Sequence, residues 1–323
     1  MGKPRVMKIS AEPAKITLDE AYEEFLVVKK SENVVPATIR NYNHCYKKFY
    51  EYYNFNKATL AEEITQNTLN RYKNWLLNQD LKFNSINHYI GDLKPFIIYL
   101  QKMEYIKPVE FKKLRGQEVG VKFYTPEEMA VLLQKPVDRK IYGAWRSWCA
   151  VSLMYSTGAR TSSVLEVRVG DLDLPRQTIT FTHQKNKSLL VLPLSDSMVR
   201  IIREYCAKSG INLADREHLL FPSISNEPLT PQGLWKSIGE YCESRGVEYK
   251  GLHAFRHSFA SQYIRNGGNP VKLQRILNHS TFQQTQRYLH LFGEDLKADF
   301  DIVNPLDTAL KNRTRAKKLN TDF

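Results

Sequence analysis

The sequence has few cysteines, glycines and prolines. Its 323 residues include 4 Cys, 15 Gly and 14 Pro. The cysteines are widely separated, form no CxxC pair and have no histidine partner at zinc-finger spacing, which argues against a zinc ribbon and a disulfide framework. So few glycines and prolines are not typical of a fibrous chain. We expect reduced, mostly buried thiols at Cys45, Cys149, Cys206 and Cys242.

Long hydrophobic runs are also missing. No apolar stretch approaches the roughly 18 residues that a membrane-spanning helix needs. The first residues, MGKPRVMKISAEPAK, contain no hydrophobic core of the kind found in signal peptides. We therefore expect neither membrane insertion nor secretion, and predict a cytoplasmic protein.

What the sequence does have is enough apolar material for about two domains, and an excess of positive charge. Its hydrophobic fraction is 42%, with 15 Phe, 18 Tyr and 4 Trp, which is too rich for a disordered protein. The net charge of +13 favours a polyanionic partner such as nucleic acid or an acidic membrane surface. The basic excess is concentrated in residues 1–122 (+6) and 309–323 (+4). This distribution is expected if both regions lie near a polyanion. The alternative explanation is that the first region is merely a solvated surface and the second a frayed terminus.

The periodicity predicts an all-helical first domain over residues 16–105, after a flexible basic arm at 1–15. Thr17 and Glu20 form a capping-box pattern before an apolar helical stripe. Further helical stretches are expected at 36–50, 69–77 and 86–100, because apolar residues recur there at intervals of three or four. Residues 106–122 lose this periodicity and carry five Lys or Arg, which indicates a basic interdomain linker.

A second domain is predicted over residues 123–295, mainly helical with a small β-hairpin. Thr125, Pro126 and Glu128 are typical of a helix N-terminus. The alternating segments 178–182 and 189–194, separated by a polar, basic turn, predict the hairpin. Helices are expected at 144–155, 162–167, 197–206, 231–245, 253–266 and 270–277. The fold class is thus a helical domain followed by an α+β domain.

Six polar residues of the second domain suggest chemistry on a phosphodiester. They are two arginines, a lysine, two histidines and a tyrosine, namely Arg160, Lys185, His253, Arg256, His279 and Tyr288. Each residue alone is more often a surface or packing residue than a catalyst. No acidic pair and no metal-ligand cluster accompanies them in the sequence. Together they fit chemistry on a phosphodiester that needs no metal ion.

Each of these residue types has a physical role in such a reaction. The guanidiniums of Arg160 and Arg256 can hold the nonbridging oxygens, on which negative charge develops. His253 and Arg256 are i and i+3 near the start of one expected helix and share its face. A hairpin lysine, Lys185, can protonate the leaving oxygen. Tyr288 is the candidate nucleophile, because a cationic site can activate a phenol whose ordinary pKa is about 10.

These residues stand in runs that resemble the active-site boxes of the tyrosine recombinase (phage-type integrase) family. The runs are Thr157-Gly-Ala-Arg160, Lys185 before Pro193-Leu194, His253-Ala-Phe-Arg256-His-Ser-Phe-Ala, and Leu277-Asn-His279-Ser followed by Tyr288. Residues 16–105 are similar to the SAM-like core-binding domain of the family, notably at 38–42 and 84–87. The resemblance implies DNA cleavage through a 3′-phosphotyrosine, a Holliday junction, and a homotetramer on two DNA sites at the nucleoid. It implies no cofactor, and accessory DNA-bending or directionality proteins are possible partners.

Two positions depart from the pattern of the family, and one role has two candidates. Where this chain has Ser163, the family usually has an acidic residue that helps to orient the site. Either Glu166 or another carboxylate takes the place of that acid, or Arg160 is held differently. Asn278 replaces the usual glycine, and asparagine also tolerates a left-handed helix end. Lys187 is the alternative to Lys185.

The function implied is that of a mobile-element integrase or transposase, and three alternatives remain open. They are chromosome-dimer resolution of the Xer type, strand relaxation of the type IB topoisomerase kind, and a DNA-binding regulator that does not cut. Residues 296–323 combine an apolar stripe with a basic tail. We expect this segment to dock on a neighbouring subunit, with docking on its own subunit as the alternative.

Overall fold

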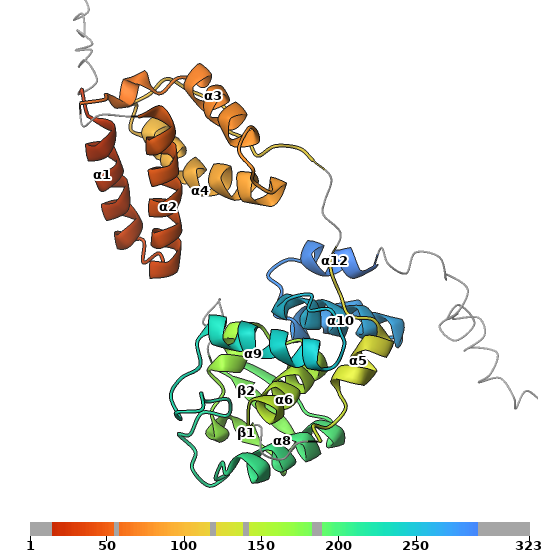
Figure 1. Ribbon diagram of the computed structural model, residues 1–323. Helices are drawn as coiled ribbons and strands as arrows, with labels where there is room; N and C mark the ends of the chain where they lie inside the picture. Colours follow the sequence, from red (N-terminus) through yellow and green to blue (C-terminus); the bar gives the residue numbers. More distant parts are fainter. Residues whose placement is uncertain (1–14, 55–57, 117–120, 138–141, 183–188, 290–323) are drawn as a thin grey trace, which may run out of the picture. The chain divides into compact units, whose positions relative to one another are not determined.

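The chain forms two compact units, residues 1–119 and residues 120–323 (Figure 1). The computed structural model describes residues 15–54, 58–116, 121–137, 142–182 and 189–289. No helix within these ranges is both long and apolar enough to cross a membrane. All four cysteines are free thiols and buried, as expected.

The first unit is helical, as the periodicity predicts. It contains α1 (Leu18–Ser31), α2 (Pro36–Tyr53), the 3-10 turn η1 (Ala61–Glu63), α3 (Gln66–Leu77) and α4 (Phe83–Lys102). The predicted capping box at the start of α1 is present, with the Thr17 hydroxyl accepting from the Glu20 amide. α2 packs on α4, and its Tyr46 ring stacks on Tyr22 of α1 with centroids 3.7 Å apart.

Part of the segment expected to be a linker, 106–122, is packed into the first unit. Ile106 and Phe111 are buried in the core of the first unit. The Asn87 side chain, on α4, binds both the amide and the carbonyl of Leu114. Residues 106–115 therefore belong to the first unit, where they form neither helix nor strand. Their apolar residues are too sparse for helical periodicity, so the sequence pattern could not reveal their burial.

The second unit is built around α6 (Tyr142–Thr157), which is buried on nearly all sides. α6 packs against α8 (Asp196–Ser209), α9 (Pro231–Ser244) and α10 (Leu252–Arg265). The remaining helices are α5 (Pro126–Leu132), α7 (Thr161–Leu165), α11 (Pro270–Ile276) and α12 (Gln283–Leu289). The predicted capping box of Thr125 and Glu128 is present at the start of α5.

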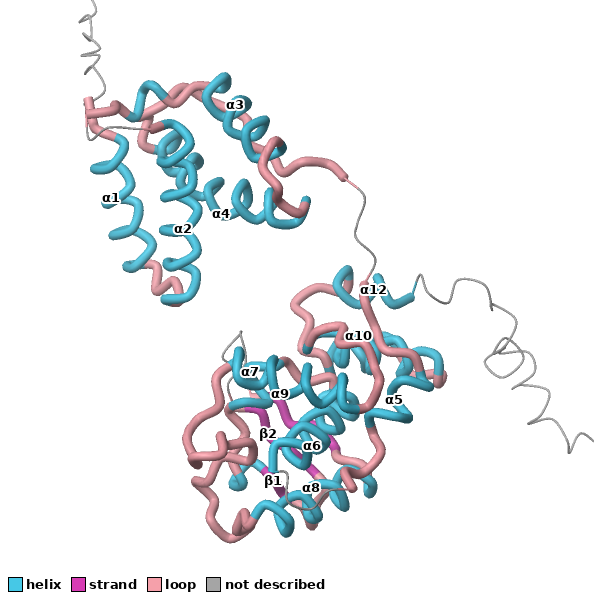
Figure 2. Tube along the Cα trace, in the orientation of Figure 1, coloured by secondary structure: helices cyan, strands magenta, loops and turns pink. Residues whose placement is uncertain are grey.

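A small antiparallel sheet completes the second unit, coloured magenta in Figure 2. β2 (Thr178–Phe181) pairs with β3 (Leu190–Pro193), which confirms the hairpin, and Thr178 lies opposite Pro193. A two-residue strand, β1 (Leu172–Asp173), adds to the other edge of β2 after the 3-10 turn η2 (Val169–Asp171). The sequence did not predict β1, because two residues are too few for an alternating pattern.

Candidate active site

The guanidinium of Arg256 is held by two main-chain carbonyls. From the first turns of α10, its Nη1 donates to the Gly158 carbonyl at 2.7 Å, and its Nη2 donates to the Leu277 carbonyl at 2.6 Å. The side chain is buried. Burial, followed by the charge of Arg160, lowers the pKa of Arg256 to about 10. The guanidinium is therefore still charged at neutral pH, and its orientation is fixed before any substrate arrives.

Arg160 lies in the turn between α6 and α7, beside Arg256. Gly158 has a φ of +64° in this turn. Arg160 itself is the N-cap of α7, and its Nη2 donates to the Asn278 carbonyl at 3.2 Å. Desolvation lowers the pKa of Arg160. Arg160 and Arg256 thus bind the carbonyls of two neighbouring residues, Asn278 and Leu277.

The end of α11 presents those carbonyls and also His279. Asn278 has a φ of +48°, which confirms the expected left-handed position after the helix. The His279 amide then donates back to the Gln274 carbonyl at 3.1 Å. The His279 Nδ1 lies 2.8 Å from the hydroxyl of Thr285, a completely buried residue of α12. The orientation of the His279 ring is therefore set by a neighbour that the sequence did not indicate.

His253 lies one turn before Arg256 on α10, at the surface of the site. It is the second residue of the helix, after Gly251 with a φ of +90°. Desolvation lowers the pKa of His253, as do the charges of Arg256 and then Arg160. The His253 side chain is exposed and remains accessible to a substrate.

Tyr288 is packed into the same cluster from α12, with only 3% of its surface exposed. It belongs to a small core with Ala260, Leu273 and Leu277. Its hydroxyl lies 2.7 Å from Nδ1 of His257. The structure therefore brings together five of the six predicted residues, and adds two partners, His257 and Thr285, to which the sequence reasoning gave no role.

The sequence matches two families that together cover most of the chain. Residues 122–294 match the Phage integrase family, and residues 17–115 match the Phage integrase SAM-like domain. The chain belongs to the phage integrase, or tyrosine recombinase, family. It is therefore an enzyme that cuts and rejoins DNA by site-specific recombination.

Relatives of this recombinase include Xer proteins. The tyrosine recombinase XerD of Staphylococcus haemolyticus is 26% identical over 303 residues, which is 90% of this chain and 99% of the relative. XerC of a Roseiflexus species is 24% identical over 282 residues, covering 85% of this chain and 90% of the relative.

Solved structures share the fold of this recombinase. The Tn1549 transposon integrase in complex with transposon right end DNA aligns with a TM-score of 0.69 and 16% identity, over 84% of this chain and 94% of that one. A lambda integrase dimer bound to a core site aligns with a TM-score of 0.68 and 17% identity, over 84% and 95%. The expected fold class, a SAM-like helical domain plus an α+β catalytic domain, is confirmed.

Lys185 and its alternative Lys187 lie outside the described residues. The two strands that flank them are described: β2 ends at Phe181, and Leu190 pairs with it at the start of β3. The assignment of the lysine role in this recombinase therefore remains a prediction.

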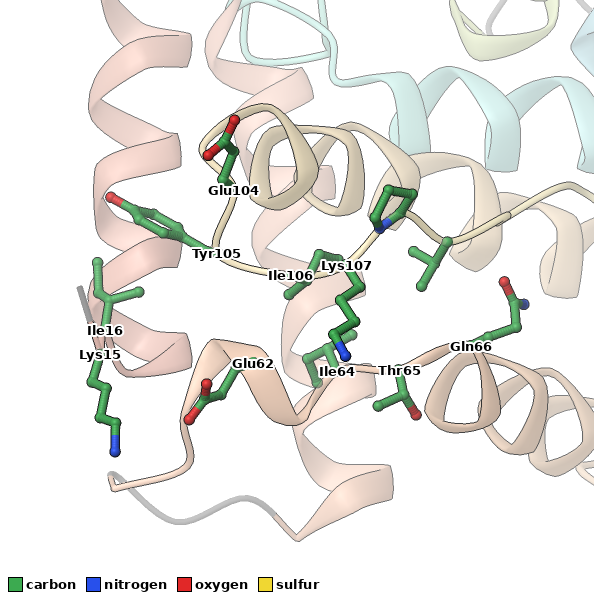
Figure 3. Close-up of a pocket in the computed structure, with 12 residues that line it drawn as sticks. Lys15, Ile16, Glu62, Ile64, Thr65, Gln66, Glu104, Tyr105, Ile106 and Lys107 are labelled. Carbon is green, nitrogen blue, oxygen red and sulfur yellow. The ribbon is translucent and has the colours of Figure 1, made fainter. Parts of the chain in front are cut away.

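Two other features of the recombinase lie in its first unit, apart from the predicted residues. A pocket of about 580 Å³ is lined by Lys15 and Ile16 just before α1, by residues between 62 and 66, and by the chain at 104–109 (Figure 3). Among the described residues, Cys45, His88 and Asp92 have ligand atoms within 4.8 Å of one another and could hold a metal ion. Burial raises the pKa of Cys45 to about 12, so a metal would have to displace a proton from a weakly acidic thiol. The sequence did not reveal this group, because Cys45 is far from the other two along the chain.

Proposed function

We propose that Tyr288 attacks a DNA phosphodiester and forms a 3′-phosphotyrosyl link. The observation that carries this proposal is that Tyr288 shares a small buried core with Leu277, whose carbonyl holds the Arg256 guanidinium. The candidate nucleophile is thereby in the same cluster as the two arginines that can bind the phosphate. The energy of the broken bond is kept in the new link, so rejoining requires no cofactor.

The remaining residues supply charge and protons around that phosphate. Arg160 and Arg256 bind the nonbridging oxygens, where two guanidiniums stabilise the charge of the transition state. His253 and His279 donate hydrogen bonds to the same oxygens. Lys185 protonates the leaving 5′-oxygen, and Lys187 is the alternative.

The reaction then proceeds to strand exchange. The 5′-hydroxyl of a partner duplex attacks the phosphotyrosine, a Holliday junction forms, and the second pair of strands is exchanged within a homotetramer on two DNA sites. We assign this activity to a mobile element, as its integrase or transposase, working on the nucleoid with accessory DNA-bending or directionality proteins. The transposon integrase among the similar folds supports this assignment.

Chromosome-dimer resolution is the second candidate, because relatives that match most of this chain are named XerC and XerD. Type IB strand relaxation and non-cutting regulation are the two other candidates. The regulator is disfavoured by the cluster itself, since five of the six predicted residues lie together in it.

One experiment distinguishes these functions. The protein is incubated with DNA fragments that span the flanks of its own gene and with chromosomal DNA, and covalent junctions are mapped by sequencing. Junctions at the gene's flanks support a mobile element, and junctions at one fixed chromosomal site support dimer resolution. Relaxation without exchange indicates a topoisomerase, and no adduct indicates a regulator. A Tyr288→Phe variant that still forms the adduct would show that another residue attacks.

A further inference from the structure

The hydroxyl of Tyr288 is already in contact with a base. Nδ1 of His257 lies 2.7 Å from the Tyr288 Oη, and the two rings are tilted by 44° with centroids 5.9 Å apart. His257 lies on α10 directly after Arg256, and it is half-buried. A short contact between a phenol and an imidazole nitrogen is the geometry that proton transfer requires.

The other two histidines of the site have different surroundings. His279 uses its Nδ1 for the Thr285 hydroxyl. His253 lies at the exposed edge of the site, where the charges of Arg256 and Arg160 act on it. Both of these histidines are the proposed ligands of the phosphate, whereas His257 contacts the hydroxyl of the proposed nucleophile.

We propose that His257 is a further catalytic residue, the base that takes the proton from Tyr288 when Tyr288 attacks DNA. This inference rests on the proposed role of Tyr288 as nucleophile. In the tautomer that carries its proton on Nε2, Nδ1 has the free lone pair that accepts the proton.

The step balances without any further reactant. The Oη–H bond breaks and its proton passes to Nδ1, while Oη forms a bond to phosphorus and the bond from phosphorus to the 5′-oxygen breaks. The leaving oxygen takes a proton from the general acid, for which Lys185 is the candidate. On rejoining, a 5′-hydroxyl attacks, its proton returns to the general acid, and the His257 imidazolium returns the first proton to Oη.

The substitution that tests this role keeps the hydrogen bond but removes the base. In His257→Asn the amide oxygen can replace Nδ1 as a hydrogen-bond acceptor, but it does not take up a proton near neutral pH. We expect adduct formation on a nicked suicide duplex, under single-turnover conditions, to slow by about 100-fold or more, the size typical of a lost general base. DNA affinity and the melting temperature should remain those of the native protein.

A second substrate distinguishes a defect in activating the nucleophile from a defect in protonating the leaving group. When sulfur replaces the bridging 5′-oxygen, the leaving group needs no proton, so a missing general acid no longer matters. The His257→Asn defect should persist on this substrate, because its cause lies at the nucleophile. The matched control is His218→Asn, since the His218 ring contacts the carbonyl of its own neighbour Leu219 and His218 has no proposed role in the reaction. This control should cleave at the native rate.

The possible results are distinct. If the native protein forms no adduct through Tyr288, the proposed function fails before any variant is compared. If the native protein reacts and His257→Asn reacts equally fast or faster, the base assignment is overturned and the nucleophile stands. If the sulfur substrate rescued His257→Asn, His257 would instead act as the general acid that protonates the leaving group. Should His257→Asn lower the melting temperature, His257→Gln is measured in the same way, with the same expectations.

Discussion

The hydroxyl of Thr285 lies 2.8 Å from Nδ1 of His279, and Thr285 is three residues before Tyr288 on α12. One short helix therefore carries both the candidate nucleophile and the residue that orients a candidate phosphate ligand. The side chains of Thr285 and Tyr288 are almost completely buried. A shift of α12 would therefore change both the position of the candidate nucleophile and the orientation of the His279 ring.

Thr285→Val should slow DNA cleavage while DNA affinity is maintained. Valine has nearly the shape of threonine but removes the hydroxyl, so the His279 ring loses its partner. Single-turnover adduct formation measures the effect, for which we expect a loss of about tenfold or more, in the range of one hydrogen bond. Thr285→Ser keeps the hydroxyl and should remain close to native. Equal rates for the two variants would mean that the contact does not orient His279.

Gly158→Ala should both destabilise the second unit and impair cleavage. A Cβ at Gly158 would lie 2.5 Å from Phe259 and 2.6 Å from Leu277, and the Gly158 carbonyl holds Arg256. We expect a loss of about 2 to 4 kcal/mol from overpacking and the left-handed conformation together. Chemical denaturation measures this loss. Gly210→Ala is the matched control, because Gly210 has a φ of +71° but no atom within 4 Å of a Cβ; it should lose only about 1 kcal/mol.

Cleavage by Lys185→Ala should be rescued by sulfur at the bridging 5′ position. A thiolate is a good leaving group and does not need the proton that Lys185 is expected to supply. The rates on the oxygen and sulfur substrates are compared for Lys185→Ala and, as its counterpart, Lys187→Ala. If sulfur rescued only Lys187→Ala, Lys187 and not Lys185 would be the general acid.

Chelation should leave cleavage intact. The groups that the site offers to a phosphate are guanidiniums and imidazoles, which neutralise charge without a divalent ion. Adduct formation is measured with EDTA and with added magnesium. A loss of cleavage that magnesium restores would require a metal-dependent mechanism.

Removal of residues 296–323, which lie outside the described part of the chain, should abolish tetramers on DNA and strand exchange. Binding to a single site should weaken only modestly, by the contribution of the lost basic residues. Native gel shifts and recombination assays measure the two activities. A truncated protein that assembles and recombines normally would support docking of the segment on its own subunit.

The sequence predicts most of the fold, because the signals are local. The capping boxes at Thr17 and Thr125 lie within one helical turn, and the helices of the second unit begin and end within a few residues of the predicted limits. The short helix α12 was not predicted, since seven residues give little periodicity.

The contacts between residues of the site are harder to predict from the sequence. His257 stands in the same run as Arg256, yet it meets Tyr288 across 31 positions of chain. The carbonyls of Leu277 and Asn278 hold the arginines through the main chain, and no side-chain pattern encodes such contacts. Such relationships depend on how α10, α11 and α12 pack.

The burial of the four thiols makes this recombinase suitable for site-directed labelling. Burial raises the pKa of Cys45 to about 12 and that of Cys206 and Cys242 to about 11, and raises that of Cys149 as well. Maleimide dyes react with exposed thiolates, so the native chain gives little background. A fluorophore pair at Val27→Cys and Ile224→Cys, both at well-exposed positions and one in each unit, would report in real time whether the distance between the units changes when DNA is added.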